Sequence, residues 1–192
     1  MSSCARGIDH VGLTVPDIEA ATEFFRGAFG CEELYRTSYR DLLDADGELA
    51  GPGEGEGEGE GDDGLHSILG TAPGSQILEL RLLSLGSGAT LELFEFGPAP
   101  GRRGDCPLPS DVAIQHIAVY VDDVPAALER VVACGGSALD GPHPLHGPEA
   151  GEGNSFVYAR APWGVFLELL SYPGGCSYEH GVRGRRYTPP PI

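Results

Sequence analysis

Hydrophobic and polar residues alternate along residues 7–15, a pattern typical of a β-strand with one buried face. The apolar face of this segment consists of Val11, Leu13 and Val15. We expect that face to pack on a helix. His10, on the opposite face of the predicted strand, then points away from the helix.

A helical pattern follows directly after this strand. Asp17 stands at the expected N-cap position, and Gly30 is placed to end the helix. The apolar residues between them recur at spacings of three and four: Ile18, Ala21, Phe24, Phe25 and Phe29. Three more strands are predicted after the helix, over residues 32–38, 76–85 and 90–96.

The same order of elements occurs a second time in the chain. Residues 114–121, IQHIAVYV, repeat the pattern of residues 8–15, IDHVGLTV, at an offset of 106 residues, and each copy has histidine at its third position. The segments LELFEF and LELLSY, which begin at Leu91 and Leu167, match at an offset of 76 residues. The second copy is predicted to contain a strand, a helix, a short strand, an exposed loop and two further strands, over residues 113–121, 124–134, 137–139, 140–153, 154–160 and 165–172.

These patterns predict an α+β protein made of two similar modules. The predicted organisation is a first module over 1–98, a linker over 99–112, a second module over 113–173 and a C-terminal tail over 174–192. An acidic insertion over about 44–75 interrupts the first module, and its core, GPGEGEGEGEGDDG, carries six acids and no base. A segment with so little apolar surface and so much like charge is expected to be disordered.

The repeated segments also carry the candidate chemistry. Glu92 and Glu168 are each flanked by leucines that should contact the helix layer, so both glutamates are expected on the helix-free face, as the repeated histidines are. An ionised carboxylate in an apolar strand is costly without a partner. Glu95 has the opposite parity and is expected to be a surface residue. Four residues at matching positions are therefore candidate ligands of one divalent cation held between the two halves of the chain: His10, Glu92, His116 and Glu168.

Composition limits the function classes. A net charge of -17 argues against nucleic-acid binding, because binding to phosphates needs clustered Lys and Arg. The five cysteines are odd in number and show no CxxC spacing, which favours reduced thiols in the cytoplasm. No signal peptide and no apolar run of membrane-spanning length is found, so we expect a cytoplasmic protein without membrane association.

Together, the repeated motifs resemble the vicinal oxygen chelate superfamily, which includes glyoxalase I, methylmalonyl-CoA epimerase, fosfomycin-resistance enzymes, extradiol dioxygenases and bleomycin-resistance proteins. The resemblance covers residues 7–43 and 76–173. It implies paired βαβββ modules whose sheets form a half-open barrel around a metal site. By position it implies the ligand set His10, Glu92, His116 and Glu168. Nitrogen and oxygen ligands of this kind suit one divalent metal ion. They do not decide which of Ni, Co, Mn, Fe, Zn and Mg is bound.

The resemblance implies a metal-dependent glyoxalase-like lyase or isomerase that acts on a small to medium oxygenated substrate through a metal-stabilised enolate or oxyanion. Glu92 or Glu168 would be the catalytic base. An Fe(II)-dependent dioxygenase using His10, His116 and Glu168 is an alternative, which Glu92 disfavours as a fourth ligand. A drug- or product-sequestering resistance protein is a second alternative.

The partner of the site is expected to be a small molecule. The positions inferred to line it are partly aromatic, which favours a medium-sized substrate: Thr14, Phe94, Phe96, Tyr120, Phe166 and Leu170. Four histidines without a counterpart in the repeat are expected in loops, two of them in a loop that borders the pocket: His66, His180, His143 and His146. The sequence leaves open whether the modules pair within one chain or across a homodimer.

Overall fold

The computed structural model describes residues 8–38, 69, 71–72, 75–98, 104, 106–110, 116–177 and 189–190. Most of the acidic insertion and most of the tail lie outside the described residues. The disorder predicted for the insertion therefore stays a prediction. The chain forms two compact units, of which the first contains β1 to β4 and the second contains β5 to β9. Each unit is described by itself.

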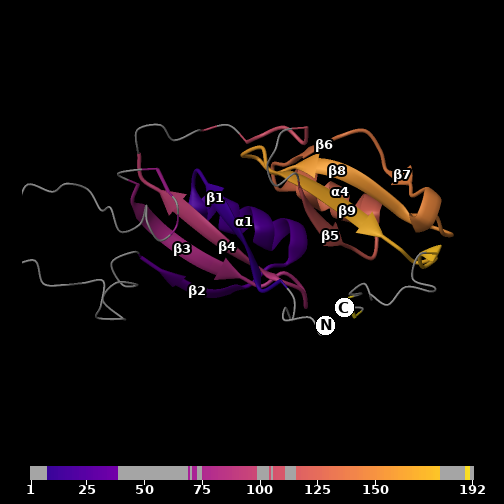
Figure 1. Cartoon of the computed structure of the whole chain (residues 1–192), viewed down its shortest axis with the longest axis horizontal. Helices are drawn as coiled ribbons and strands as arrows, with labels where there is room; N and C mark the ends of the chain where they lie inside the picture. Colours follow the sequence, from indigo (N-terminus) through magenta and orange to yellow (C-terminus); the bar gives the residue numbers. More distant parts are fainter. Residues whose placement is uncertain are drawn as a thin grey trace, which may run out of the picture. The chain divides into compact units, whose positions relative to one another are not determined.

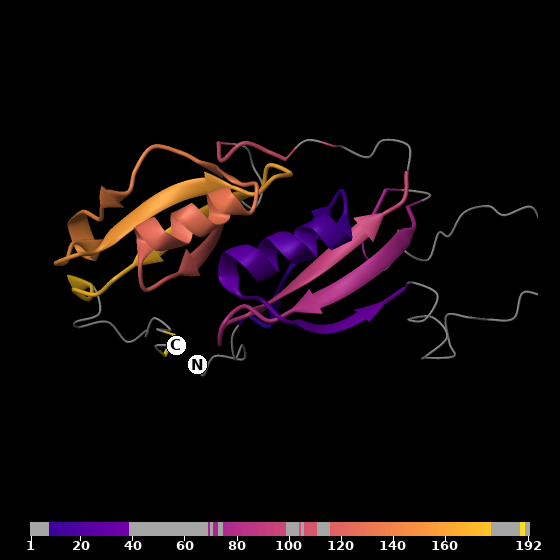
Figure 2. The same ribbon diagram turned by 180° about the vertical axis from the view of Figure 1, so that it is seen from behind.

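The first unit contains one open four-stranded sheet, and α1 runs across one face of it (Figures 1 and 2). The elements of this part of the chain are β1 His10–Val15, α1 Ile18–Phe29, β2 Glu33–Thr37, β3 Ile77–Leu83 and β4 Thr90–Phe96. The helix α1 begins in the first unit, and its residues from 23 onward are grouped with the second unit. The strand order is β1-β4-β3-β2, with β1 parallel to β4 and the other pairs antiparallel. All five elements were predicted.

The second unit repeats this arrangement. Its elements are β5 Ile117–Tyr120, α4 Val124–Ala133, β6 Ser137–Ala138, β7 His143–Pro144, the 3-10 turn η1 Gly147–Glu149, β8 Ser155–Arg160 and β9 Phe166–Ser171. The strand order is β5-β9-β8-β6, with β5 parallel to β9 and β7 paired to β8 (Figure 1). The α+β fold of two βαβββ modules is confirmed, and neither sheet closes on itself. The loop predicted over 140–153 is corrected, because it contains β7 and η1.

The helices α1 and α4 begin and end in the same way, which reflects the repeat. The side chains of Asp17 and Asp123 accept hydrogen bonds of 2.9 Å from the backbone amides three residues further on. The glycines that follow the two helices, Gly30 and Gly135, have φ values of 69° and 90°, a left-handed conformation that favours glycine. None of the helices in the described part of the chain is long and apolar enough to cross a membrane.

The buried layer of each unit lies between its helix and its sheet. In the first unit, Leu91 and Leu93 of β4 are buried together with Ile18 and Ala21 of α1. In the second unit, Leu167 and Leu169 of β9 are buried, as are the helix residues that share the same core, namely Val124, Ala127 and Val131. This layer leaves the other face of each sheet free of its own helix, and we call that face the open face of the unit.

Candidate metal and substrate site

The open face of the first unit carries the first predicted pair of ligands. The register of β1 and β4 pairs Gly12 with Glu92, so His10, two residues earlier, lies on the same face as that glutamate. The Nε2 atom of His10 is 3.3 Å from Oε2 of Glu92. The neighbours Leu91 and Leu93 are buried on the opposite side, which confirms the parity predicted from the sequence.

A neighbouring carboxylate orients His10. The Nδ1 atom of His10 lies 2.9 Å from Oδ1 of Asp9. This hydrogen bond, together with the charge of Glu92, raises the pKa of the His10 imidazole above its ordinary value. A histidine whose Nδ1 is engaged by a carboxylate presents Nε2 as the atom available to a metal.

The second unit carries the matching pair. The Nε2 atom of His116 is 3.0 Å from Oε2 of Glu168. The register of β5 and β9 pairs Ala118 with Glu168, as Gly12 is paired with Glu92 in the first unit. In both sheets a small residue, Gly12 or Ala118, therefore stands beside the glutamate.

Each His–Glu pair has the spacing of two adjacent metal ligands. Two ligands at right angles on an ion with bonds of about 2.1 Å lie about 3 Å apart. The observed nitrogen–oxygen distances of 3.3 Å and 3.0 Å are close to this value. Within the part of the chain that the structure describes, potential donors form such pairs but no group of three or more. Imidazole nitrogen and carboxylate oxygen are donors that divalent ions accept, and each unit contributes one such pair.

The surroundings of Glu168 differ from those of a solvated carboxylate. Burial raises its pKa, the nearby His116 lowers it and the charge of Glu149 raises it again, with a net upward shift. The ring of Tyr158 stands edge-on to His116, with centroids 5.2 Å apart, and Tyr158 is paired with Glu168 across β8 and β9. Burial and the charge of Glu168 raise the pKa of Tyr158, so its hydroxyl stays protonated as a potential donor.

Sequence reasoning missed Tyr158 and Glu149. Tyr158 alternates with Val157 and lies on the same face of a predicted strand as Phe156. This alternation was the only feature of the sequence that could have placed Tyr158 on the open face. Glu149 lies in a segment predicted as an irregular loop, and nothing in the sequence marked it.

The six residues predicted to line the site have the parity of the open faces. Thr14 is exposed, and the stacked rings of Phe94 and Phe96 lie 5.9 Å apart, packed against Ile77 and Leu80. Tyr120 stacks on Tyr172 at 6.1 Å. Two of the six are buried, each only 6% exposed: Phe166 and Leu170. Contact between these residues and a substrate stays a prediction.

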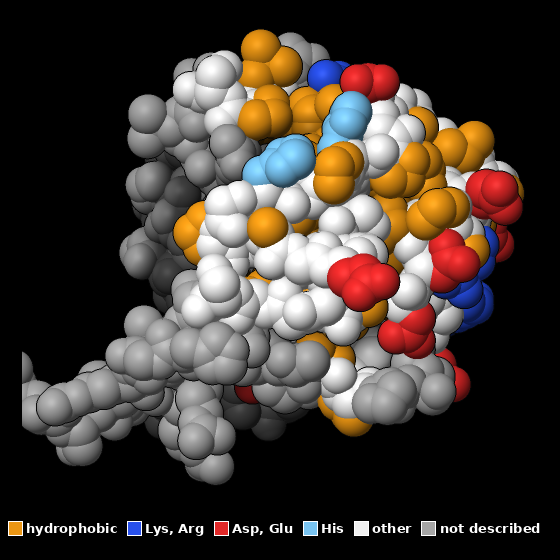
Figure 3. Space-filling model, turned by 90° about the vertical axis from the view of Figure 1, so that its right-hand side faces the viewer, with side chains coloured by type: hydrophobic (Ala, Val, Ile, Leu, Met, Phe, Trp, Pro, Cys, Tyr) orange, Lys and Arg blue, Asp and Glu red, His pale blue; other side chains and the backbone are white. Residues whose placement is uncertain are grey.

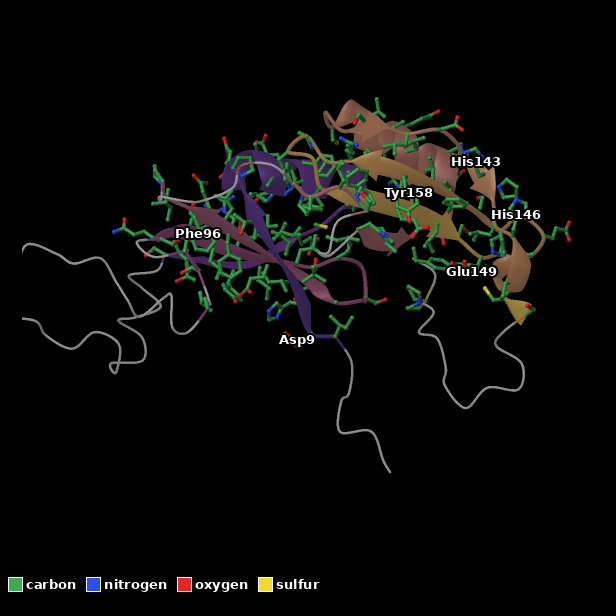
Figure 4. All side chains as sticks on the ribbon, turned by 45° about the horizontal axis from the view of Figure 1, so that its top comes forward. Asp9, Phe96, His143, His146, Glu149 and Tyr158 are labelled. Atoms are coloured by element: carbon green, nitrogen blue, oxygen red, sulfur yellow. The ribbon has the colours of Figure 1, made fainter. Side chains whose placement is uncertain are left out.

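His143 and His146 lie at the margin of the second unit, where Figure 4 labels both. The His143 ring is 6.0 Å from that of Phe156, and its Nε2 atom is 3.2 Å from Oδ2 of Asp140. Both histidines are exposed, and Figure 3 shows histidine side chains on one face of the molecule among hydrophobic ones. His66 and His180 lie outside the described residues.

Comparison with known proteins identifies the family. The family described as the Glyoxalase/Bleomycin resistance protein/Dioxygenase superfamily matches residues 9–158. The chain belongs to this superfamily. The match includes both histidines of the two pairs and Glu92, so the resemblance that the sequence motifs indicated is confirmed.

Three relatives illustrate the family. The chain is 34% identical over 187 residues to a 2-epi-5-epi-valiolone epimerase from an Actinomyces species, covering 96% of this chain and 90% of the relative. A glyoxalase family protein from Bacillus cereus has a TM-score of 0.59 at 14% identity, covering 88% of this chain and 95% of that one. A glyoxalase I variant from Zea mays has a TM-score of 0.53 at 15% identity, covering 85% of this chain and 44% of that one. The two structural likenesses show the fold alone, whereas the epimerase supports an isomerase of this superfamily.

Proposed function

We propose that this protein is a divalent-metal-dependent epimerase that acts on a polyhydroxylated cyclic ketone of the valiolone type. The observation that carries the reaction class is the 34% identity to a 2-epi-5-epi-valiolone epimerase over 96% of this chain. The sequence alone left a lyase, an isomerase, an Fe(II)-dependent dioxygenase and a sequestering protein open. This relative favours the isomerase among them.

Four residues are proposed to hold one divalent ion, drawn from Ni, Co, Mn, Fe, Zn and Mg: His10, Glu92, His116 and Glu168. Support comes from the two His–Glu pairs at 3.3 Å and 3.0 Å, and from the presence of one pair in each repeat. When bound, such an ion supplies positive charge that stabilises the negative charge developing on a carbonyl oxygen. The chain's own residues must then move the proton.

Epimerisation next to a carbonyl requires one proton to leave and one to return. A carboxylate takes the proton from the carbon beside the carbonyl, and the electron pair of the C–H bond moves toward the carbonyl oxygen. Return of a proton to the other face of that carbon inverts its configuration, so the atoms balance without an oxidant or reductant. We propose Glu92 or Glu168 as the residue that removes the proton.

The proposed substrate contacts follow the open faces of the two sheets. The side chains proposed to line the substrate site are the six predicted positions on these faces. They supply aromatic and aliphatic surface and two hydroxyl groups: Thr14, Phe94, Phe96, Tyr120, Phe166 and Leu170. A cytoplasmic location and a homodimer stay predictions.

The deciding experiment incubates the metal-loaded protein with 2-epi-5-epi-valiolone in D2O and follows the ketone by NMR. The expected result is a second epimer that carries deuterium at the inverted carbon. Elemental analysis of protein purified without oxygen and without added metal identifies the resident ion, and a chelator should abolish turnover until that ion is restored.

Two controls make the result specific. Glu92→Gln should remove turnover, because the amide is a poorer ligand and no base. Oxygen consumption should be undetectable with the wild-type protein. Consumption of oxygen with cleavage of the ketone, or no epimer and no deuterium incorporation with the fully loaded protein, would contradict the proposal.

A further inference from the structure

Glu149 ends the 3-10 turn η1 and presents its carboxylate to the open face of the second unit. The hydroxyl group of Tyr172 donates a hydrogen bond of 2.9 Å to Oε1 of Glu149. Tyr172 directly follows β9 and has the parity of Glu168, and its ring stacks on Tyr120 of β5. Figure 4 labels Glu149 on the turn and Tyr158 on β8 of the same unit.

The backbone of the turn is fixed by a buried amide. Asn154, only 2% exposed, donates from Nδ2 to the carbonyl oxygens of Glu149 at 2.8 Å and Gly175 at 2.7 Å. Its Oδ1 accepts a hydrogen bond of 2.9 Å from the amide of Gly174. The amide group of Asn154 therefore ties the turn to the segment after β9, and the position of Glu149 is held from both its backbone and its side chain.

The packing between these segments leaves no room for a side chain at Gly151. A Cβ atom at Gly151 would lie 2.8 Å from the carbonyl oxygen of Gly175, closer than real Cβ contacts allow. The hydroxyl group of Ser177 adds a hydrogen bond of 3.0 Å to the carbonyl oxygen of Pro148. Such rigid support is what a group that recognises a ligand needs.

The carboxylate of the half-buried Glu149 has one hydrogen-bonded side-chain partner in the described part of the chain. Within the described part of the chain, no Lys, Arg or His forms an ion pair with Glu149, and Tyr172 engages only one of its two oxygens.

We propose that Glu149 is a specificity-determining residue that accepts hydrogen bonds from ring hydroxyl groups of the substrate, a role that rests on the proposed function. An ionised carboxylate only accepts hydrogen bonds, and its two oxygens can serve two adjacent hydroxyl groups. A polyhydroxylated ketone supplies such hydroxyl groups away from the reacting carbon. An anionic substrate would be repelled by the same charge.

The test compares the metal-loaded wild-type protein with Glu149→Gln and with the matched control Glu152→Gln. Glu152 lies in the same loop and is exposed. For 2-epi-5-epi-valiolone, Glu149→Gln should raise KM roughly 10- to 100-fold and leave kcat within about threefold, because a hydrogen bond to a charged group is lost in both ground and transition state. Metal content should be unchanged, and Glu152→Gln should behave as the wild type.

A second ligand tests the assignment to ring hydroxyl groups. As a competitive inhibitor, 2-hydroxycyclohexanone has one hydroxyl group, beside its ketone, and should bind Glu149→Gln as well as it binds the wild type. An unchanged KM, a loss confined to kcat, a loss of bound metal, or equal weakening of this inhibitor would each overturn the inference while the wild-type epimerase activity stands. Absence of activity in the wild type itself would instead overturn the proposed function, and this inference with it.

Discussion

The carboxylate of Glu95 accepts a hydrogen bond of 2.9 Å from the backbone amide of Ile18, the first residue of α1. Glu95 was predicted to be a surface residue, and that prediction is wrong, because the side chain is half-buried and satisfies an unpaired amide at the start of the helix. Glu92, three positions earlier on the same strand, lies on the opposite face beside His10. One strand thus carries a structural carboxylate on one face and a candidate ligand on the other.

Glu95→Ala should destabilise the protein without affecting metal binding. The loss of a helix-capping hydrogen bond is expected to lower the free energy of unfolding by about 1 kcal/mol. Urea denaturation measures this change, and calorimetric titration with the resident metal measures the affinity. Glu92→Gln is the matched comparison and should show the reverse, with weak metal binding and near-normal stability. Equal metal affinity in both variants would remove Glu92 from the ligand set.

Replacement of either repeated histidine should abolish tight metal binding. His10→Ala and His116→Ala each delete a proposed ligand, and we expect a loss of at least roughly 100-fold in affinity because the remaining ligands cannot replace a borderline nitrogen donor. His143→Ala, which removes an exposed histidine that also pairs with a carboxylate, is the control. If the two variants bind divalent metal as tightly as the parent, the site is misplaced.

Asp9→Asn should weaken metal binding without removing a ligand. The Asp9 carboxylate accepts the Nδ1 proton of His10, and loss of such an orienting carboxylate lowers metal affinity by about 10-fold. Asp140→Asn is a close control, since Asp140 is equally exposed and pairs with His143. The two variants are compared by competition with a chromogenic chelator. A parallel loss in both would point to the net charge of the protein rather than to the orientation of His10.

Cys31 should be unreactive in the folded protein and should make stability depend on pH. Burial raises the pKa of its thiol from the ordinary value of 9.0 to about 12. The protonated thiol therefore contributes stability that is fully present below pH 9 and lost as the pH rises toward 12. At pH 8, iodoacetamide should label the half-buried Cys134 before Cys31, and urea should make both accessible. Rapid labelling of Cys31 without urea would contradict its burial.

Much of the fold could be predicted because its pattern is local and repeated. Alternation in β1 and β4, helical spacing in α1, and a helix-ending glycine at Gly30 each depend on neighbours a few residues away. The second copy of the same pattern gave an independent check on every element. The weaker elements, β7 and η1, were missed because β7 has two residues and gains its strand character only by pairing with β8.

The strand faces of the candidate ligands could be predicted because parity alone decides the face of a strand. His10 and Glu92 belong to different strands that are far apart in the sequence, yet the position of each relative to its leucine neighbours was enough to put both on the open face. The face of the strand alone could not distinguish a carboxylate in solvent from one that caps the start of a helix. Glu95 therefore became clear only when β4 was seen beside the start of α1.

The sequence by itself determined the α+β class, the repeated module and the faces that carry the two His–Glu pairs, because side-chain direction in strands and helices follows from backbone geometry. Only the tertiary structure decided the partners of individual side chains. The distance from His116 to Glu168, the ring of Tyr158 against that histidine and the anchoring of Glu149 by Tyr172 and Asn154 all join separate elements. Such contacts depend on strand register and on how loops return to the sheet, and no local pattern encodes either.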